Sequence, residues 1–163
     1  MKRTIAVILA AASLLLCACT AAPQKATVSM FDLSEAMRAA HKGEAELSYA
    51  SSSDSDAEAE FAHLSDLDYS KVGSFFLLYA SDGSASTDEI AVIAVKDAAD
   101  VKAAAESLRA HVEKRRSLYA SYAPQLVPAL DSARVFTEAQ YAVLVVSANE
   151  ADVSRAFKDF INK

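Results

Sequence analysis

Two apolar runs, IAVIAV at residues 90–95 and YAVLVV at residues 141–146, decide the fold of this 163-residue chain. Each has the length of a buried strand and is shorter than a typical buried helix. Each is followed closely by Ala-Asp-Val, at residues 99–101 and 151–153, where a helical pattern begins. This echo predicts a ββα unit used twice, although strand-to-helix junctions also favour such residues without any duplication.

The predicted strands pair as two hairpins. They cover residues 75–80, 89–96, 134–137 and 140–147. Between the first two strands, the segment 81–88 is polar and contains Gly83. Such a segment between two apolar runs predicts a hairpin with an open loop.

Helical patterns flank and separate the hairpins. The predicted helices cover residues 33–42, 56–64, 99–122 and 150–162, with a short helical turn at 125–130. Asp32 and Ser55 are predicted to cap the first two helices, because each has a glutamate three residues later. Asn149 is predicted to cap the last helix, and Pro124 ends the long one.

The element order ααββαββα predicts an α+β fold with a four-stranded, mainly antiparallel sheet. A sheet with one wet face alternates apolar and polar residues, whereas these strands are apolar at nearly every position. Either helices cover both faces of the sheet, or one face is kept for a partner. Four helices are enough to cover four strands, so we expect the first arrangement.

The N-terminus has the pattern of an export signal. Lys2 and Arg3 precede an apolar run at residues 4–16. A membrane span needs about 20 apolar residues, so this run is too short to be one. Its length and its basic flank are typical of a secretory signal peptide.

The end of this signal, Leu16-Cys17-Ala18-Cys19, resembles a bacterial lipobox, in which an aliphatic and two small residues precede the lipidated cysteine. The resemblance implies removal of residues 1–18 and attachment of diacylglycerol, with fatty-acyl chains such as palmitate, at Cys19. Cys17 fits less well, because Leu16 would then stand where a small residue is needed. Ordinary secretion with cleavage after Ala22 is the alternative. Two or more acyl chains are enough for stable membrane anchoring.

The processed chain is predicted to have a lipidated tether at residues 19–30 and a single α+β domain at residues 31–163. It would lie on the extracytoplasmic face of the cell membrane. Loss of residues 1–18 removes two basic residues and no acidic one, which changes the formal net charge from −6 to −8. A negative domain disfavours nucleic acid as a partner. With Cys19 acylated no thiol remains, which excludes disulfides, thiolate metal sites and a cysteine nucleophile.

Short stretches in the second half of the chain match the pattern of a known family. They are Asp68-Tyr69, residues 88–92, Lys96-Asp97, and residues 122–124, 133–135 and 141–144. These stretches resemble the bacterial domain of unknown function DUF4358 over about residues 68–163. The resemblance implies a lipoprotein domain and carries no assigned activity. Where we expect a glycine before the strand at 141, this chain has Glu138-Ala139-Gln140, which puts a different residue in the turn.

The histidines and the acidic run give no metal motif. His41, His63 and His111 are far apart and form no His-x-x-x-His pair, so we expect structural or surface histidines. The acidic run at residues 54–60 begins like a calcium-binding EF-hand loop, but Ala59 stands where that loop needs glycine. Negative charge at a helix N-terminus is the simpler interpretation.

We therefore expect no catalytic, cofactor or metal site. The Gly-x-Ser-x-Gly and Ser-x-x-Lys motifs are absent, and three glycines leave no phosphate-binding loop. A carboxylate pair assembled through space leaves no local pattern, so a small hydrolase-like enzyme of the cell envelope is the alternative. Tyr119 and Tyr122 share one helix face and either pack in the core or line the edge of a peptide or ligand groove.

The sequence thus predicts a membrane-anchored extracytoplasmic lipoprotein with a noncatalytic binding or interaction domain. Its partners would be membrane lipid through Cys19 and a protein, peptide or small ligand in the cell envelope. Two-lobed solute receptors need a far longer chain than this one, so a receptor of that type is not expected.

Overall fold

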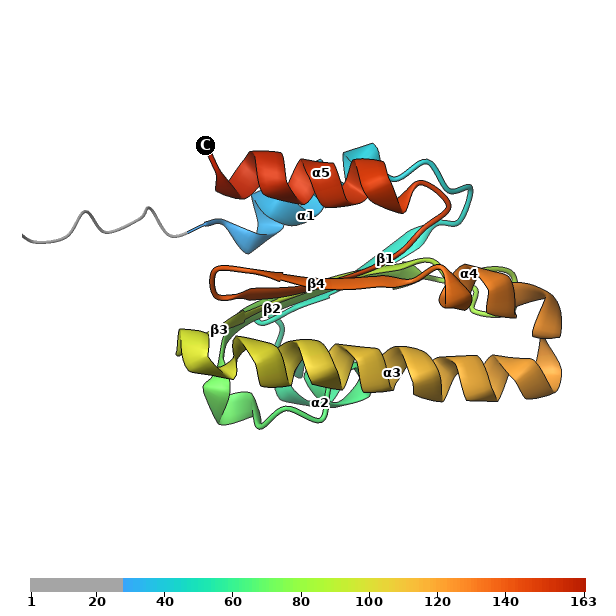
Figure 1. Ribbon diagram of the computed structural model, residues 1–163, viewed down its shortest axis with the longest axis horizontal. Coiled ribbons are helices and arrows are strands. Elements are labelled where there is room, and N and C mark those ends of the chain that lie inside the picture. The colour runs from blue at the N-terminus through green and yellow to red at the C-terminus, as the bar shows by residue number, and fades with distance from the viewer. Residues whose placement is uncertain (1–27) are drawn as a thin grey trace, which may run out of the picture.

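A five-stranded antiparallel sheet forms the middle layer of the structure, a computed structural model that describes residues 28–163 (Figure 1). The strands are β1 (Leu47–Ser51), β2 (Val72–Ala80), β3 (Glu89–Val95), β4 (Arg134–Glu138) and β5 (Tyr141–Val146). Their order across the sheet is β1-β2-β3-β5-β4. The two apolar runs, β3 and β5, are therefore neighbours at its centre.

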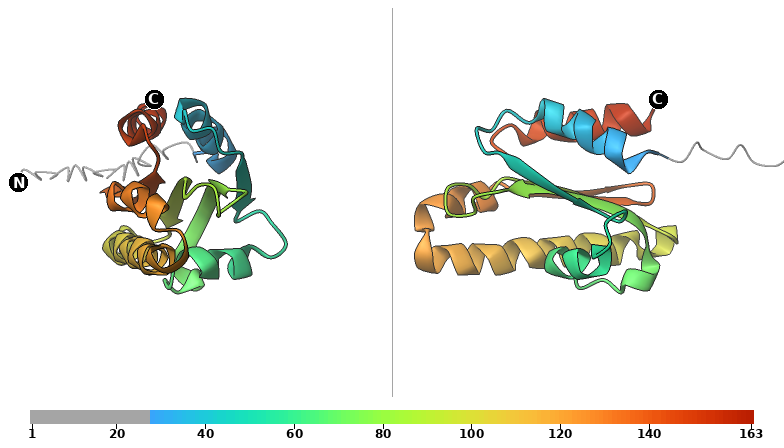
Figure 2. Two further views of the ribbon diagram at one scale, coloured as in Figure 1. Left: turned by 90° about the vertical axis from the view of Figure 1, so that its right-hand side faces the viewer. Right: turned by 180° about the vertical axis from the view of Figure 1, so that it is seen from behind.

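Helices cover both faces of this sheet, as predicted. They are α1 (Met30–Ala40), α2 (Ala57–Leu64), α3 (Val101–Tyr122), α4 (Val127–Asp131) and α5 (Glu150–Ile161), with 3-10 turns at Tyr69–Lys71, Ala98–Asp100 and Pro124–Leu126. Helices α1 and α5 lie side by side on one face, and α2 and α3 lie on the other (Figures 1 and 2). No helix within residues 28–163 is long and apolar enough to cross a membrane.

Alternate residues of the central strands contribute to two separate cores. In β3, Ile90 and Val92 pack beneath α1 and α5, whereas Ala91 and Ile93 pack beneath α2 and α3. All four side chains are fully buried. A strand buried on both faces has no wet side, which is why these runs lack polar alternation.

The sheet has one strand more than the sequence predicted. The missed strand is β1 (LSYAS), which is only five residues long and has serines at two of them. It is an edge strand that pairs only with β2, and only Leu47 and Ala50 among its apolar side chains are buried. Edge strands need less hydrophobic pattern than central ones, so the sequence signal was weak. The α+β class is confirmed, but the element order is αβαββααββα.

Two helix starts also differ from the prediction. Helix α1 begins at Met30, inside the predicted tether, because Ser29 rather than Asp32 is its cap. The Ser29 hydroxyl accepts a hydrogen bond from the Asp32 backbone N–H at 3.2 Å. At α2, Asp56 occupies the N-cap position predicted for Ser55.

The two ββα segments place their helices on opposite faces. Strands β3 and β5 are antiparallel neighbours. A two-fold axis relating them would run perpendicular to the sheet and would keep both following helices on one face. Helix α3 instead covers one face and α5 the other (Figure 1). The arrangement therefore argues against the predicted duplication of a whole ββα unit.

Candidate functional site

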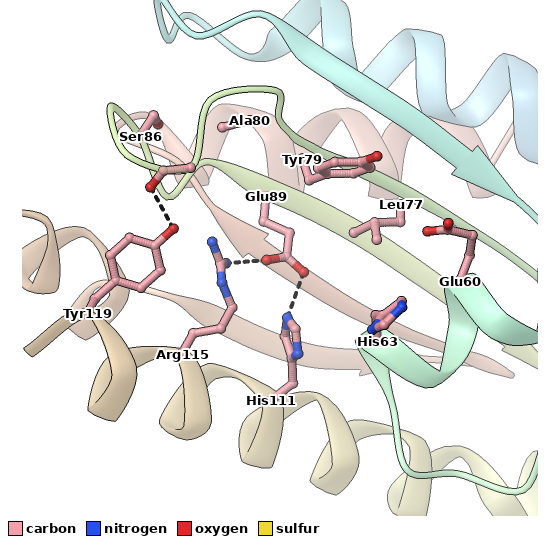
Figure 3. Close-up of a pocket in the computed structure, with 11 residues that line it drawn as sticks. Glu60, His63, Leu77, Tyr79, Ala80, Ser86, Glu89, His111, Arg115 and Tyr119 are labelled. Atoms are coloured by element: carbon pink, nitrogen blue, oxygen red, sulfur yellow. Dashed lines mark hydrogen bonds and ion pairs between the residues drawn. The ribbon is translucent and has the colours of Figure 1, made fainter. Parts of the chain in front are cut away.

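A cavity of about 320 Å³, here called the first cavity, opens between α2 and α3 (Figure 3). Leu77 and Tyr79 of β2 form its floor, together with Glu89 at the start of β3. Tyr79 and Glu89 are register partners, so the sheet holds them side by side. Helix α2 contributes Glu60 and His63 from the opposite wall. Small-ligand sites are concave, mostly apolar and contain a few converging polar groups, and this cavity has that character.

Helix α3 presents a polar stripe to the first cavity. His111, Arg115 and Tyr119 are spaced four residues apart and therefore lie one above the other on the same helix face. His111 and Arg115 point toward Glu89 of β3, and Tyr119 points toward the connection between β2 and β3 (Figure 3). A stripe of this composition on a buried helix face needs polar partners from the sheet.

Glu89 supplies those partners. It is only 4% exposed. Its Oε1 lies 2.9 Å from His111 Nε2, and its Oε2 accepts a hydrogen bond from Arg115 Nη1. A carboxylate can only accept, so the His111 nitrogen that faces it carries a proton. Burying an unpaired charge costs several kcal/mol, and the two bases offset that cost here.

The β2–β3 loop, residues 81–88, closes one end of the first cavity. Its backbone is held by α3, because Tyr119 Oη donates to the Gly83 carbonyl at 2.8 Å and Arg115 Nη2 donates to the Thr87 carbonyl at 3.3 Å. A Cβ at position 83 would lie 3.1 Å from the Tyr119 hydroxyl. Glycine thus allows the loop to approach α3 closely.

Three polar side chains of the first cavity are left free for a ligand, because Glu60, His63 and Tyr79 make no side-chain hydrogen bond or ion pair among residues 28–163. The ion pairs among its lining residues all involve Glu89. Glu60 is half-buried and takes part in no ion pair or side-chain hydrogen bond among residues 28–163, and Tyr79 is 37% exposed. The Glu60 carboxylate points toward Leu77 across the cavity (Figure 3).

A second cavity of about 430 Å³ lies on the other side of α3, against α4 and β4. Its charged side chains include Arg109, Arg116 and Arg134. Arg116 Nε lies 2.5 Å from Asp131 Oδ1, but both side chains are nearly half exposed. Exposed pairs of this kind contribute about 0–1 kcal/mol, so water competes with any ligand there.

His41, Ser147 and Asp88 form a cluster with the residue types of a nucleophilic triad. His41 Nδ1 lies 2.9 Å from Ser147 Oγ, and His41 Nε2 lies 3.5 Å from Asp88 Oδ2. Ser147 is only 5% exposed, its hydroxyl donates to Asn149 Oδ1 at 2.9 Å, and neither cavity borders it. A nucleophile needs an open approach for its substrate, so the cluster is best explained as a structural one.

Asn149 connects this cluster to α1. Its Nδ2 donates to the Ala40 carbonyl at 2.7 Å, and its Oδ1 accepts from the Lys42 backbone N–H at 3.1 Å. Asn149 occupies the predicted cap position of α5, but its side chain makes no capping bond to α5 and instead satisfies the end of α1. Gly43 leaves room for His41, because a Cβ there would lie 2.4 Å from His41 Nε2.

The residues proposed from sequence are only partly brought together. Tyr119 lines the first cavity, while Tyr122 is 53% exposed beside it, with ring centroids 4.9 Å apart. His63 and His111 meet at the first cavity, and His41 lies in the separate cluster. Cys19 and the predicted signal peptide lie outside the described residues.

The metal interpretation of the acidic run gains no support from the geometry. Within residues 28–163, no group of three or more His, Cys, Asp or Glu side chains is placed to hold a metal ion. Asp54 instead accepts a hydrogen bond from the Ser51 backbone N–H at 2.6 Å. Glu60, at the end of the run, reaches the first cavity.

Sequence reasoning missed Glu89 and Arg115. A local signal existed for both residues. Glu89 is the one charged residue at the start of a strand that is otherwise apolar, and Arg115 stands midway between His111 and Tyr119 on one helix face. What could not be read locally is that these two elements pack against each other.

Comparison with known families supports the resemblance noted above. The family model described as Domain of unknown function (DUF4358) matches residues 45–147, which is more than half of the chain. The match begins before β1 and ends after β5, so it starts and ends earlier than the 68–163 estimate. It includes every residue named at the first cavity. No curated protein and no solved structure matches the chain. The chain belongs to the DUF4358 family of domains of unknown function.

Proposed function

We propose that this domain is a noncatalytic binding module that takes a small ligand, or a side chain of a partner protein, into the first cavity. The observation that carries the proposal is the internal pairing of Glu89 with His111 and Arg115. Paired groups hold the walls in place and leave an apolar floor for a ligand. Preorganised, mostly apolar hollows of this kind favour binding, because little ordering is left to do.

A nuclear magnetic resonance screen with small fragments tests this proposal. We expect shift changes at the backbone amides of Leu77, Tyr79 and His111. In a Glu60→Phe variant, a phenyl ring extends from α2 toward Leu77 across the first cavity, and these changes disappear. Glu58→Phe, on the exposed side of the same helix, is the matched control. Fragments that bind equally well to the Glu60→Phe variant would contradict the proposal.

The cellular setting of this module is also a proposal. The lipobox at Cys19 supports a lipid anchor on the extracytoplasmic face of the cell membrane. A Cys19→Ser variant is then expected in the soluble fraction, with the thermal stability of the domain unchanged. Retention of a correctly processed variant in the membrane fraction would refute the anchor.

A hydrolase-like enzyme is the alternative function. Its support is that Glu60 and Glu89 both line the first cavity. However, both oxygens of Glu89 are engaged by bases, so this carboxylate is poorly placed to accept or donate a proton during turnover. Turnover that survives purification and is abolished by Glu60→Gln would favour the enzyme over the binding module.

A further inference from the structure

The charged groups of the first cavity fall into a paired set and a free set. The paired set is Glu89 with His111 and Arg115. Arg115 uses Nη1 for Glu89 and Nη2 for the Thr87 carbonyl, so its positive charge is directed away from the open volume. A guanidinium engaged in this way is a weak attractor for an anionic ligand.

The free set has the opposite preference. Glu60 brings a carboxylate with no cation partner among the described residues, and it is held at the wall by a helical backbone. His63, three residues along the same helix, is also unpaired among the described residues, and in its neutral form it does not repel a cation. Tyr79 offers an exposed aromatic ring on the floor. A cation is attracted both to a carboxylate and to the face of an aromatic ring. Leu77 adds apolar surface between these groups.

We infer that the first cavity binds a cationic amine carried on an apolar chain, with Glu60 and Tyr79 contacting the ammonium group and Leu77 the chain. This inference rests on the proposed binding function and specifies its ligand. A primary amine on an alkyl chain, free or as a lysine side chain of a partner, has this chemistry. The formal net charge of −6 further favours the approach of cations over anions.

The second cavity provides an internal contrast. It is lined by three arginines against two acidic residues, Glu113 and Asp131. Glu150 lies 3.4 Å from Arg134 Nη1 beside this lining, so three arginines meet three carboxylates and the charges cancel. A cationic ligand finds no excess of negative charge there and is expected to select the first cavity.

Three probes of one chain length test the inference. They are n-hexylamine, n-hexanol and hexanoate, which carry a positive charge, no charge and a negative charge. Titrations are followed by nuclear magnetic resonance on the chain from residue 19 with Cys19→Ser, which retains every described residue. At pH 8 ordinary histidines are neutral and hexylamine stays protonated. We expect hexylamine to bind about five- to tenfold more tightly than hexanol, and hexanoate most weakly.

Two variants identify the contacts. Glu60→Gln is expected to weaken hexylamine about fivefold and to leave hexanol unchanged. Glu58→Gln, on the exposed side of the same helix, alters the net charge equally and is expected to leave the affinities for hexylamine and hexanol unchanged. Tyr79→Leu keeps an apolar floor without the ring and is expected to weaken hexylamine two- to fivefold.

The source of the amine is tested with a short peptide pair, acetyl-Gly-Lys-Gly-amide and its norleucine counterpart. Preference for the lysine peptide, with affinity equal to or above that of hexylamine, indicates a partner protein. Binding of hexylamine without the peptide indicates a free small amine.

The outcomes separate the inference from the proposed function. If hexanol binds as tightly as hexylamine, or if Glu58→Gln weakens hexylamine binding as much as Glu60→Gln does, the inferred cationic class of ligand is wrong. The proposed binding function then still stands. Tightest binding by hexanoate would overturn the class in favour of an anion held by Arg115. If no probe perturbs the first cavity, the proposed function itself fails.

Discussion

The two hairpins of the central sheet end in very different connections. Strands β2 and β3 are joined by the long loop at residues 81–88, whereas β4 and β5 are joined by Ala139 and Gln140 alone. The long loop depends on α3, which holds it through Tyr119 and Arg115. The short turn is held within the sheet, where the Gln140 carbonyl accepts a hydrogen bond from the Val95 N–H at 3.0 Å, and its Ala139 has a φ of 50°, in the left-handed region.

The difference shows where this fold places its buried polar groups. At the long loop, polar side chains of α3 enter the interior and are paired there with Glu89 and with backbone carbonyls, and the first cavity lies beside them. At the short turn, the chain reverses within the sheet, and neither the first nor the second cavity borders it. Binding residues generally lie on loops that a rigid scaffold positions. The long-loop hairpin therefore carries the candidate site.

The largest expected effect comes from removing the charge that ties the long-loop hairpin to α3. Glu89→Gln keeps the shape of the side chain but leaves Arg115 and His111 without their anion in a buried place. Removing one partner of a buried pair typically costs 3–5 kcal/mol, so we expect the free energy of unfolding to fall by about 3 kcal/mol. Urea unfolding followed by circular dichroism measures it.

Asp131→Asn is the matched control for that variant. It also removes one carboxylate from an arginine at a cavity, but this pair is nearly half exposed. We expect a loss below about 1 kcal/mol. Equal losses in the free energy of unfolding for the two variants would mean that the Glu89 pair is no better buried than the Asp131 pair. That result would contradict the contrast drawn between the two cavities.

A smaller effect is expected from Tyr119→Phe, which removes the single hydrogen bond from α3 to the Gly83 carbonyl. One such bond contributes about 1 kcal/mol. Amide hydrogen exchange in residues 81–88 should therefore accelerate, while exchange in β5 stays unchanged. Tyr49→Phe is the control, since Tyr49 lies on β1 beside Phe31 and its hydroxyl makes no hydrogen bond among the described residues. Unchanged exchange in Tyr119→Phe would show that Arg115 and the contacts of Ser81 with Glu46 and Ser48 are enough to hold the loop.

The short turn is expected to respond in the opposite direction. Left-handed backbone costs a residue with a Cβ about 1–2 kcal/mol, and glycine avoids that cost while losing some unfolded-state entropy. We expect Ala139→Gly to raise the free energy of unfolding by about 0.5–1 kcal/mol. Ala110→Gly, in the exposed middle of α3, should lower it by a similar amount. Destabilisation by Ala139→Gly would show that this turn carries no strain.

The short turn also shows what the sequence could predict. The family pattern called for a glycine before the strand at 141, and Ala139 indeed takes the backbone conformation that glycine favours. Likewise, the unbroken apolar runs correctly predicted a sheet covered on both faces. Both inferences depend only on local residue patterns, which sequence displays directly.

The candidate site was beyond such local reasoning. Glu89 contacts His111 and Arg115, which lie 22 and 26 residues later in the chain. These contacts form only when α3 packs on the sheet. Edge strand β1 gave no strong signal, because it is short and two of its five residues are serines. Pairings between elements depend on how those elements pack, and a single sequence does not display that packing.

The smallest expected effect concerns the internal order of the long loop. Asp82 accepts hydrogen bonds from Ser84, first through the Ser84 hydroxyl at 2.6 Å and then through its backbone N–H at 2.9 Å, and both lower the pKa of Asp82. A lowered pKa means that this contribution is present above the unfolded carboxyl's pKa near 3.8 and is lost as pH falls through the lower folded value. A carboxyl ¹³C titration from pH 6 to pH 2 should give Asp82 a midpoint below 3.8, with the Ser84 amide shifting at the same pH. In Asp82→Asn the Ser84 amide should not titrate. A midpoint at or above 3.8 would mean that the loop has little order of its own, so that its conformation is set by the contacts that α3 and the other neighbouring elements make with it.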